Sequence, residues 1–142
     1  MNNIHVSFDY LFSKIRSHNL SKKYFEFNWL AVSKGGIYIA YVLSLLYDKP
    51  MGIIDPHFDK LLSLEEYPNV LLIDDIIHTG STQEHCKALL NAYGFYNVDI
   101  LTLIYDPARN KSIVPNEFIL ETTELMYFPW ESKEEVEKAD YI

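Results

Sequence analysis

Two neighbouring carboxylates and a run of small hydroxyl residues stand close together in the segment VLLIDDIIHTGST, residues 70–82. A glycine flanked by hydroxyl residues at the start of a helix exposes several backbone N–H groups, and the helix dipole adds partial positive charge. Such a loop favours an anion, and above all a phosphate. Carboxylates such as Asp74 and Asp75 instead accept hydrogen bonds from a diol or stabilise positive charge. The segment therefore predicts a phosphorylated-sugar site, with phosphate over Thr79 to Thr82 and sugar hydroxyls at the two aspartates.

A capped helix that happens to follow an Asp-Asp pair would explain the same residues without any ligand. Local signals for such a helix are present, because Ser81 and Glu84 have the spacing of a capping box and Gly94 provides a stop signal. An isolated Asp pair would favour this simpler interpretation. The complete string after a buried strand is more specific, so the phosphorylated-sugar site is the main hypothesis.

Alternating strands and helices must position these residues. Apolar runs predict strands at residues 28–33, 51–54, 70–73 and 98–105, with shorter pieces at 118–120 and 125–128. Helices are expected at residues 8–15, 37–47 and 81–93, and in an acidic tail from 132. Strands that are apolar throughout are buried on both faces, and helices between them imply parallel crossovers. We predict an α/β fold, a single Rossmann-like domain over residues 1–142 with a mostly parallel central sheet flanked by helices.

Ligands of such sheets bind beyond the carboxyl ends of the strands. Two segments of the chain fall at such ends, Ser33-Lys34-Gly35-Gly36 and Asp74 to Thr82. Because the strands are parallel, we expect both segments at the same edge of the sheet.

Composition excludes several other classes of function. The chain has 142 residues, a formal net charge of -8 and no Lys/Arg cluster, which argues against nucleic acid or a membrane surface as the partner. The longest apolar stretch, residues 37–47, is too short to span a bilayer, and the N-terminal residues lack the pattern of a signal peptide. The single cysteine, Cys86, suits a reducing compartment, and we expect a cytoplasmic protein in which Cys86 is a core residue.

Three motifs together resemble the type I phosphoribosyltransferases. VLLIDDIIHTGST looks like the phosphoribosyl pyrophosphate motif of that family, with an aliphatic strand, two acidic residues and a hydroxyl-rich glycine loop. WLAVSKGGIYIA is similar to the family's pyrophosphate loop, closest to the hypoxanthine-guanine type. YFPWE, residues 127–131, resembles the end of the base-binding segment in xanthine-guanine-type members. Order and spacing agree, so the resemblance covers roughly residues 28–131.

The resemblance implies a transfer of the phosphoribosyl group from phosphoribosyl pyrophosphate to a nitrogenous, purine-like base. The base displaces pyrophosphate through an oxocarbenium-like transition state, and Mg²⁺ neutralises the leaving group. Asp74 and Asp75 would hold the ribose hydroxyls and contact Mg²⁺ indirectly, through the ligand. The other implied residues are His78, which completes the catalytic set, Thr79, Gly80, Ser81 and Thr82 for the 5-phosphate, and Ser33, Lys34, Gly35 and Gly36 for pyrophosphate. The family also implies a cis peptide bond, for which Ser33-Lys34 is the candidate.

Departures from the family pattern all concern the base. His78 stands where an acidic residue is usual, and Asp106 stands where a lysine donates to a 6-oxo group. Leu125 replaces a tryptophan that stacks on the base, and with Met126 and Asp106 it forms the expected base-binding set. An aspartate at position 106 favours a base with an amino group. A one-residue slip in the alignment, or a simple turn at Asp106-Pro107, would also account for the difference.

The expected ligands are phosphoribosyl pyrophosphate and a small nitrogenous base or nucleotide, and family members form homo-oligomers, usually dimers or tetramers. The connection from Asp55 to Tyr67 is shorter than the hood that usually covers the site, and residues 57–60 are the nearest candidates for a lid. A non-catalytic protein that binds phosphoribosyl pyrophosphate or a nucleotide as a regulatory ligand is therefore the alternative, and a hydrolase is a third possibility. Trp130 is interpreted as a packing anchor rather than a base platform.

Overall fold

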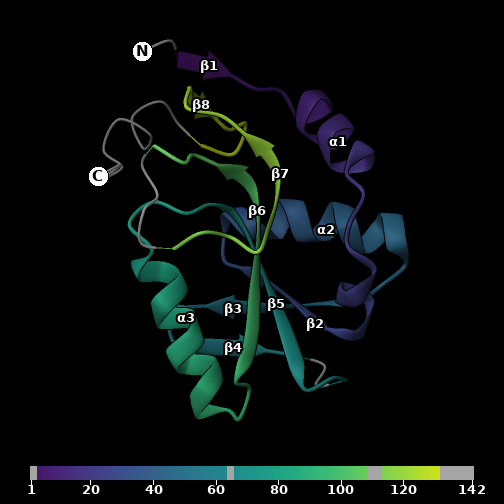
Figure 1. Cartoon of the computed structure of the whole chain (residues 1–142), viewed down its shortest axis with the longest axis vertical. Coiled ribbons are helices and arrows are strands. Elements are labelled where there is room, and N and C mark those ends of the chain that lie inside the picture. The colour runs from purple at the N-terminus through teal and green to yellow at the C-terminus, as the bar shows by residue number, and fades with distance from the viewer. Residues whose placement is uncertain (1–2, 64–65, 109–112, 132–142) are drawn as a thin grey trace.

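A six-stranded, mostly parallel sheet forms the centre of the molecule (Figure 1). The computed structural model describes residues 3–63, 66–108 and 113–131. The spatial order is β4-β3-β2-β5-β6-β7, and β4 alone runs antiparallel to its neighbour. The strands are β2 (Asn28–Val32), β3 (Met51–Asp55), β4 (Lys60–Leu62), β5 (Asn69–Ile76), β6 (Asn97–Tyr105) and β7 (Glu117–Glu121). The predicted α/β architecture is confirmed.

Helices cover both faces of this sheet, as Figure 1 shows for α3 on one side of β5 and α1 and α2 on the other. The helices are α1 (Phe8–Ser17), α2 (Gly35–Tyr47), α3 (Ser81–Ala92) and the short 3₁₀ helix η1 (Lys22–Glu26). Successive residues of β5 alternate between the faces, so Leu71 and Ile73 share one core with α1 and α2. Leu72 shares the second core with Cys86 and Leu90 of α3. Burial on both faces explains why these strands are apolar throughout.

The strand order changes direction between β2 and β5. From β2 the chain passes through α2 to β3 on one side, and from β5 it passes through α3 to β6 on the other side. Because such crossovers are right-handed, the reversal sends α2 and α3 to opposite faces. The two chain segments diverge as they leave adjacent strands, and this switch point is where ligands of open α/β sheets bind.

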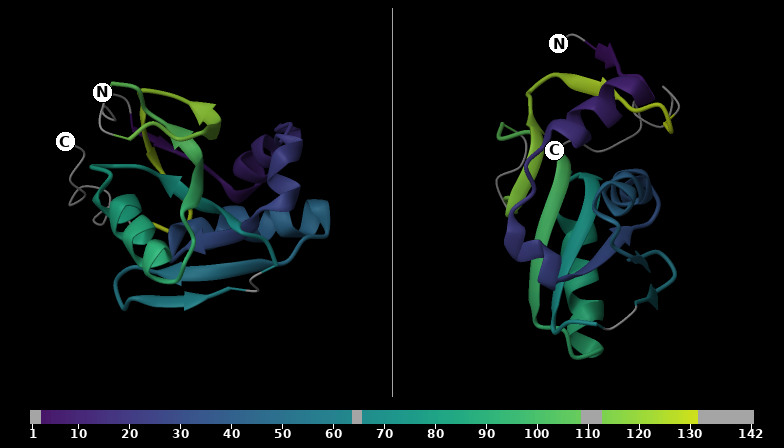
Figure 2. Two further views of the ribbon diagram at one scale, coloured as in Figure 1. Left: turned by 60° about the horizontal axis from the view of Figure 1, so that its bottom comes forward. Right: turned by 90° about the vertical axis from the view of Figure 1, so that its right-hand side faces the viewer.

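A separate two-stranded sheet joins the two ends of the described chain. Strand β1 (Asn3–His5) pairs in parallel with β8 (Leu125–Tyr127), and the His5 and Tyr127 rings stack with centroids 4.7 Å apart. Both strands lie together at one end of the molecule in Figures 1 and 2. No sequence signal predicted β1, since its partner is more than a hundred positions away.

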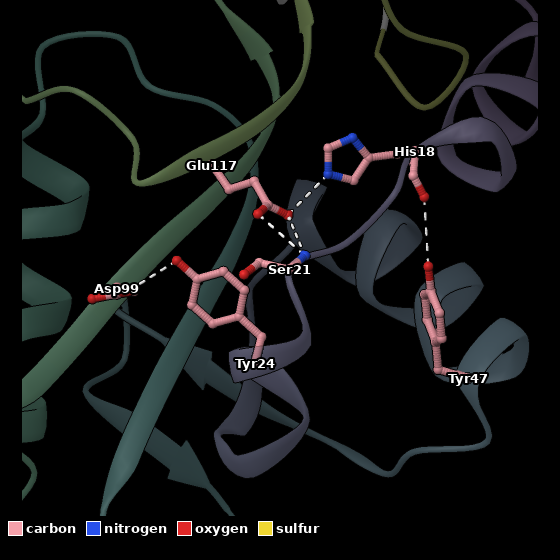
Figure 3. A network of polar contacts seen from close by, with 6 residues as sticks. All are labelled: His18, Ser21, Tyr24, Tyr47, Asp99 and Glu117. Carbon is pink, nitrogen blue, oxygen red and sulfur yellow. Dashed lines mark hydrogen bonds and ion pairs between the residues drawn. The ribbon is translucent and has the colours of Figure 1, made fainter.

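A polar network connects the segment after α1 to β6 and β7, the last two strands at one edge of the sheet (Figure 3). Glu117 of β7 accepts hydrogen bonds from His18 Nε2 at 2.9 Å and from the Ser21 backbone N–H at 3.3 and 3.4 Å. The Tyr24 hydroxyl donates to Asp99 of β6 at 2.8 Å. Burial, reinforced by Asp99, raises the pKa of the Tyr24 hydroxyl above its ordinary value. The network holds η1 against β6 and β7.

The cap of helix α3 lies one residue earlier than the sequence predicted. Its N-cap is Gly80, with φ of 90°, and Ser81 is the first helical residue, so the predicted capping box is wrong. The loop needs a left-handed residue immediately before the helix, and glycine adopts that conformation without a steric cost. The predicted acidic tail helix lies outside the described residues. Among the helices that are described, none has the length and apolar character needed to cross a membrane.

Candidate functional site

A cavity of about 210 Å³ lies at the carboxyl ends of β2 and β5, where the strand order reverses. Its walls come from the segment after β2 and from the end of β5 with the following loop, so the structure brings the two predicted motifs together. Of the residues predicted to bind phosphate or pyrophosphate, Gly36 and Ser81 are not among the lining residues. The lining residues are Val32, Ser33, Lys34, Gly35, Asp74, Asp75, Ile76, His78, Thr79, Gly80, Thr82 and Gln83.

Asp74 and Asp75 point to opposite faces of the sheet. The predicted strand ended at Ile73, but β5 continues to Ile76, so both aspartates are strand residues and alternate in direction. Asp74 faces α3, where its Oδ2 accepts a hydrogen bond from Gln83 Nε2 at 2.8 Å. The side chain is buried, with 6% exposure. Burial, followed by the neighbouring Asp75 carboxylate, raises the pKa of Asp74 well above its ordinary value.

Asp75 faces α2 and is partly exposed. Its Oδ1 accepts from the Ile76 backbone N–H at 2.7 Å, and its Oδ2 accepts from the indole Nε1 of Trp130 at 3.3 Å. The carboxylate lies directly over Gly35, the first residue of α2. The positive end of the α2 dipole therefore lies beneath this negative charge.

The two glycines of the first loop are required by close packing. A Cβ at Gly35 would stand 2.6 Å from the carboxyl carbon of Asp75. A Cβ at Gly36 would collide with the carbonyl oxygen of Ile73 and stand 3.0 Å from its carbonyl carbon. The start of α2 thus rests on the backbone of β5. The peptide bond between Ser33 and Lys34 is cis, as predicted, and the Ser33 N–H donates to Ile54 of β3 at 2.9 Å.

The second loop presents hydroxyl groups and the start of α3 to the same cavity. The Thr79 and Ser81 hydroxyls are 3.0 Å apart, and the Ser81 backbone N–H reaches Thr79 Oγ1 at 3.3 Å. Lys34 is the only lysine or arginine among the described residues that line the cavity. An anion here would therefore depend on backbone N–H groups, hydroxyls and the dipole of α3.

Trp130 is a packing residue, as the sequence interpretation held. The Tyr38 ring stacks on its indole with centroids 4.5 Å apart and 6° between the planes, and the Phe128 ring does so at 4.9 Å and 10°. If Tyr38 and Phe128 stacked on the same face of the indole at these distances, their rings would contact each other. Among the described residues, the Tyr38 and Phe128 rings make no such contact. The two rings therefore occupy opposite faces, which leaves no free face for a base.

Asp106 and Met126, which were predicted to bind the base together with Leu125, are not among the described residues that line the cavity. Leu125 and Met126 belong to β8 and pair with Asn3 and Ile4 of β1. Asp106 follows β6, is 3% exposed, and accepts a hydrogen bond from the Ala108 N–H at 3.0 Å. This hydrogen bond belongs to a turn at Asp106-Pro107, which was the alternative interpretation of Asp106 in the sequence. A base-binding role for these three residues stays a prediction.

Gln83 is a cavity residue that the sequence interpretation missed. It is 2% exposed and connects α3 to Asp74. A polar residue three positions after Gly80, on the same helix face as Cys86, was the available signal. The predicted helix placed Cys86 on the buried face, and a buried glutamine beside it requires a hydrogen-bond partner.

The short connection after β3 is a hairpin rather than a long hood. Asp55 Oδ1 accepts from the His57 and Phe58 backbone N–H groups at 3.0 and 3.3 Å, which fixes the turn. Asp59 pairs with His85 of α3 at 2.6 Å. Phe58 at the tip is 66% exposed.

The side chains around the cavity test whether the predicted Mg²⁺ could be held there. Among the described residues, no group of three His, Cys, Asp or Glu side chains is placed to hold a metal ion. The cavity offers the two carboxylates Asp74 and Asp75. Mg²⁺ commonly binds through one or two carboxylates together with substrate phosphates and water, so these residues fit an ion that arrives with a pyrophosphate ligand.

Structure comparison relates the chain to known proteins where sequence comparison does not. No protein-family model and no curated protein matches the sequence. A purine phosphoribosyltransferase from Pyrococcus horikoshii superposes with a TM-score of 0.71 at 24% identity, over 93% of this chain and 95% of that chain. The xanthine-guanine-hypoxanthine phosphoribosyltransferase of Helicobacter pylori gives 0.70 at 17%, over 92% and 94%. A hypothetical protein from Neisseria gonorrhoeae with bound ppGpp gives 0.70 at 16%, over 96% and 93%. The chain therefore has the fold of the purine phosphoribosyltransferases.

Proposed function

We propose that the protein transfers a phosphoribosyl group from phosphoribosyl pyrophosphate to a nitrogenous base and releases pyrophosphate. The observation that carries this proposal is that one cavity, at the β2–β5 switch point, collects the predicted phosphate, ribose and pyrophosphate parts of the site. It joins the Ser33–Gly35 loop, two carboxylates and the hydroxyl-rich start of α3. Each part suits a different portion of one ligand, namely pyrophosphate, ribose hydroxyls and 5-phosphate.

Different residues of the cavity would bind different parts of the ligand. Thr79, Thr82 and the N–H groups at the start of α3 hold the 5-phosphate, since the helix dipole favours negative charge there. Asp74 and Asp75 accept hydrogen bonds from the ribose hydroxyls and favour the positive charge that develops on the sugar ring. Lys34 and the adjoining backbone contact the pyrophosphate. His78 lies in the cavity wall, and its proposed role is to take or give a proton at the base.

Bound Mg²⁺ would supply neutralisation of the leaving pyrophosphate. Asp75 is the better placed of the two carboxylates to face an ion-bound ligand, because it is partly exposed whereas Asp74 is enclosed by Gln83. The protein contributes orientation of the ligand.

Regulatory binding without transfer is the second candidate, and two observations favour it. Both faces of Trp130 are occupied, so that residue offers a base no stacking surface. The structurally similar Neisseria protein holds ppGpp, a nucleotide that carries two pyrophosphate groups. A cavity with a phosphate loop and a pyrophosphate loop would suit such a ligand.

One experiment separates the candidates. The protein is incubated with Mg²⁺ and phosphoribosyl pyrophosphate, with a panel of 6-oxo and 6-amino purines and pyrimidines, while nucleotide and pyrophosphate are followed. Nucleotide formation supports transfer. Thermal stabilisation by ppGpp or phosphoribosyl pyrophosphate without turnover supports regulatory binding, and base-independent pyrophosphate release indicates hydrolysis. If none occurs, and Asp74→Asn with Asp75→Asn changes nothing, the proposed function is wrong.

A further inference from the structure

Trp130 is connected to the candidate site by one specific polar contact. Its indole Nε1 donates to Asp75 Oδ2 at 3.3 Å, across 55 positions of sequence. The other carboxylate oxygen is held by the Ile76 backbone N–H at 2.7 Å. The Asp75 carboxyl group also lies within hydrogen-bond reach of the Asp74 side chain. The lone pairs that remain on Asp75 can accept from further donors such as hydroxyl groups.

The indole itself is held firmly in place. Tyr38 of α2 stacks on one face and Phe128 on the other, and Phe8 of α1 approaches with a centroid distance of 6.2 Å. The turn that carries the indole is closed by hydrogen bonds between Phe128 and Glu131 at 3.0 and 3.2 Å. A donor on a fixed ring limits the directions that the Asp75 carboxylate can take, because rotation about the Asp75 side chain would break the contact.

Gly35 limits the carboxylate from below. A Cβ at that position would stand 2.6 Å from the Asp75 carboxyl carbon, so the missing side chain makes room for the carboxylate over the start of α2. Asp75 is thus enclosed between the helix backbone and the indole N–H, and it is turned toward the cavity that it lines.

We infer that Trp130 is a positioning residue, which orients the Asp75 carboxylate toward the ribose hydroxyls of a phosphoribosyl ligand. The inference rests on the proposed function. It gives the YFPWE segment a role toward the sugar, beyond the base-binding segment that its sequence resembles. The aromatic stack also connects α1, α2 and the segment after β8 to one ligand-facing side chain.

The test uses Trp130→Phe, which keeps an aromatic ring between Tyr38 and Phe128 and removes the N–H donor together with one ring of the indole. Binding of phosphoribosyl pyrophosphate and of inorganic pyrophosphate is measured by calorimetry in the presence of Mg²⁺. We expect the affinity for phosphoribosyl pyrophosphate to fall about 10-fold, the size expected for one hydrogen bond to a charged group. The affinity for pyrophosphate, which lacks the ribose, should stay unchanged.

Trp29→Phe is the matched control. The Trp29 indole donates to the Tyr24 carbonyl at 2.7 Å, is 1% exposed, and lies near the start of β2, at the opposite end from the cavity. This variant should lose stability without a change in the ratio of the two affinities. If lost packing alone weakened binding, the loss of affinity would parallel the decrease in Tm in both variants. A positioning effect instead changes the ratio of the two affinities in Trp130→Phe only.

A double-mutant cycle with Asp75→Ala separates direct from indirect action. If Trp130 acts through Asp75, Trp130→Phe should have little further effect on phosphoribosyl pyrophosphate binding once Asp75 is gone. Additive losses, or an unchanged affinity ratio in Trp130→Phe, would overturn the inference and leave the proposed function standing. If the natural protein binds neither ligand, both fail.

A measurement on the natural sequence covers the case in which Trp130→Phe does not fold. The chain has two tryptophans, so an NMR spectrum shows two indole N–H signals, and Trp29→Phe assigns them. Phosphoribosyl pyrophosphate should shift the Trp130 signal by more than pyrophosphate does. Equal shifts with both ligands would contradict the inference.

Discussion

Replacing each glycine of the first loop by alanine should change the stability of the protein by different amounts at the two adjacent positions. Neither Gly35 nor Gly36 has a positive φ, so the alanine backbone is not strained at either position. The difference lies in what the new Cβ meets. At Gly35 it meets the Asp75 side chain, which can rotate away, and at Gly36 it meets the Ile73 carbonyl and lies 3.1 Å from the Asp74 Cα.

The magnitudes follow from these contacts. Gly35→Ala gains up to about 1 kcal/mol of helix propensity and loses a similar amount when the Asp75 carboxylate leaves its position. We expect its free energy of unfolding to stay within about 1 kcal/mol of the natural protein. Gly36→Ala must push the start of α2 away from central strand β5, and overpacking of this kind costs about 1–3 kcal/mol. Because the obstacle is backbone, we expect the upper part of that range.

Urea denaturation followed by circular dichroism measures the contrast. With a denaturant slope of roughly 2 kcal/mol/M, Gly36→Ala should lower the midpoint by about 1–1.5 M, and Gly35→Ala by less than about 0.5 M. Gly35→Ala should instead weaken phosphoribosyl pyrophosphate binding, because it displaces Asp75. If the Gly36→Ala midpoint equals that of the natural protein, the close contact of α2 with β5 described above is wrong.

Three further predictions concern a buried acid, a polar network and a buried thiol. The pKa of Asp74 is raised in the folded state. The free energy of unfolding should therefore fall as pH rises from the ordinary pKa of 3.8 toward the raised value. Asp74→Asn should flatten this pH dependence, measured by urea titrations at a series of pH values. A steeper slope in the variant would contradict the assignment. Glu117→Gln weakens the contacts to His18 and Ser21, so it should lower the free energy of unfolding by about 1 kcal/mol in the same urea assay. An unchanged urea midpoint would show that the network does not stabilise the fold. Burial raises the pKa of Cys86 to about 12, so a thiol reagent at pH 8 should label the urea-unfolded chain and not the native one. Rapid native labelling would refute that burial.

The sequence alone determined the order of the elements and the position of the hydroxyl-rich loop that begins α3. These features depend on local properties. A doubly buried strand needs a continuous apolar run, as in Val70 to Ile73, and a loop that starts a helix needs the left-handed conformation that Gly80 adopts. The meeting of the two loops also followed, because the carboxyl ends of parallel strands share one edge of the sheet.

The tertiary structure decided how the carboxylates of that edge are oriented and what holds them. Apolar composition does not show that β5 continues through Asp74 and Asp75, and the extra residues send the two side chains to opposite faces. Their partners, Gln83 and Trp130, lie 9 and 55 positions away. Contacts at such separations depend on how helices and chain ends pack around the sheet, and a single sequence does not record that packing. The same limit applied to the pairing of β1 with β8, which joins the two ends of the described chain.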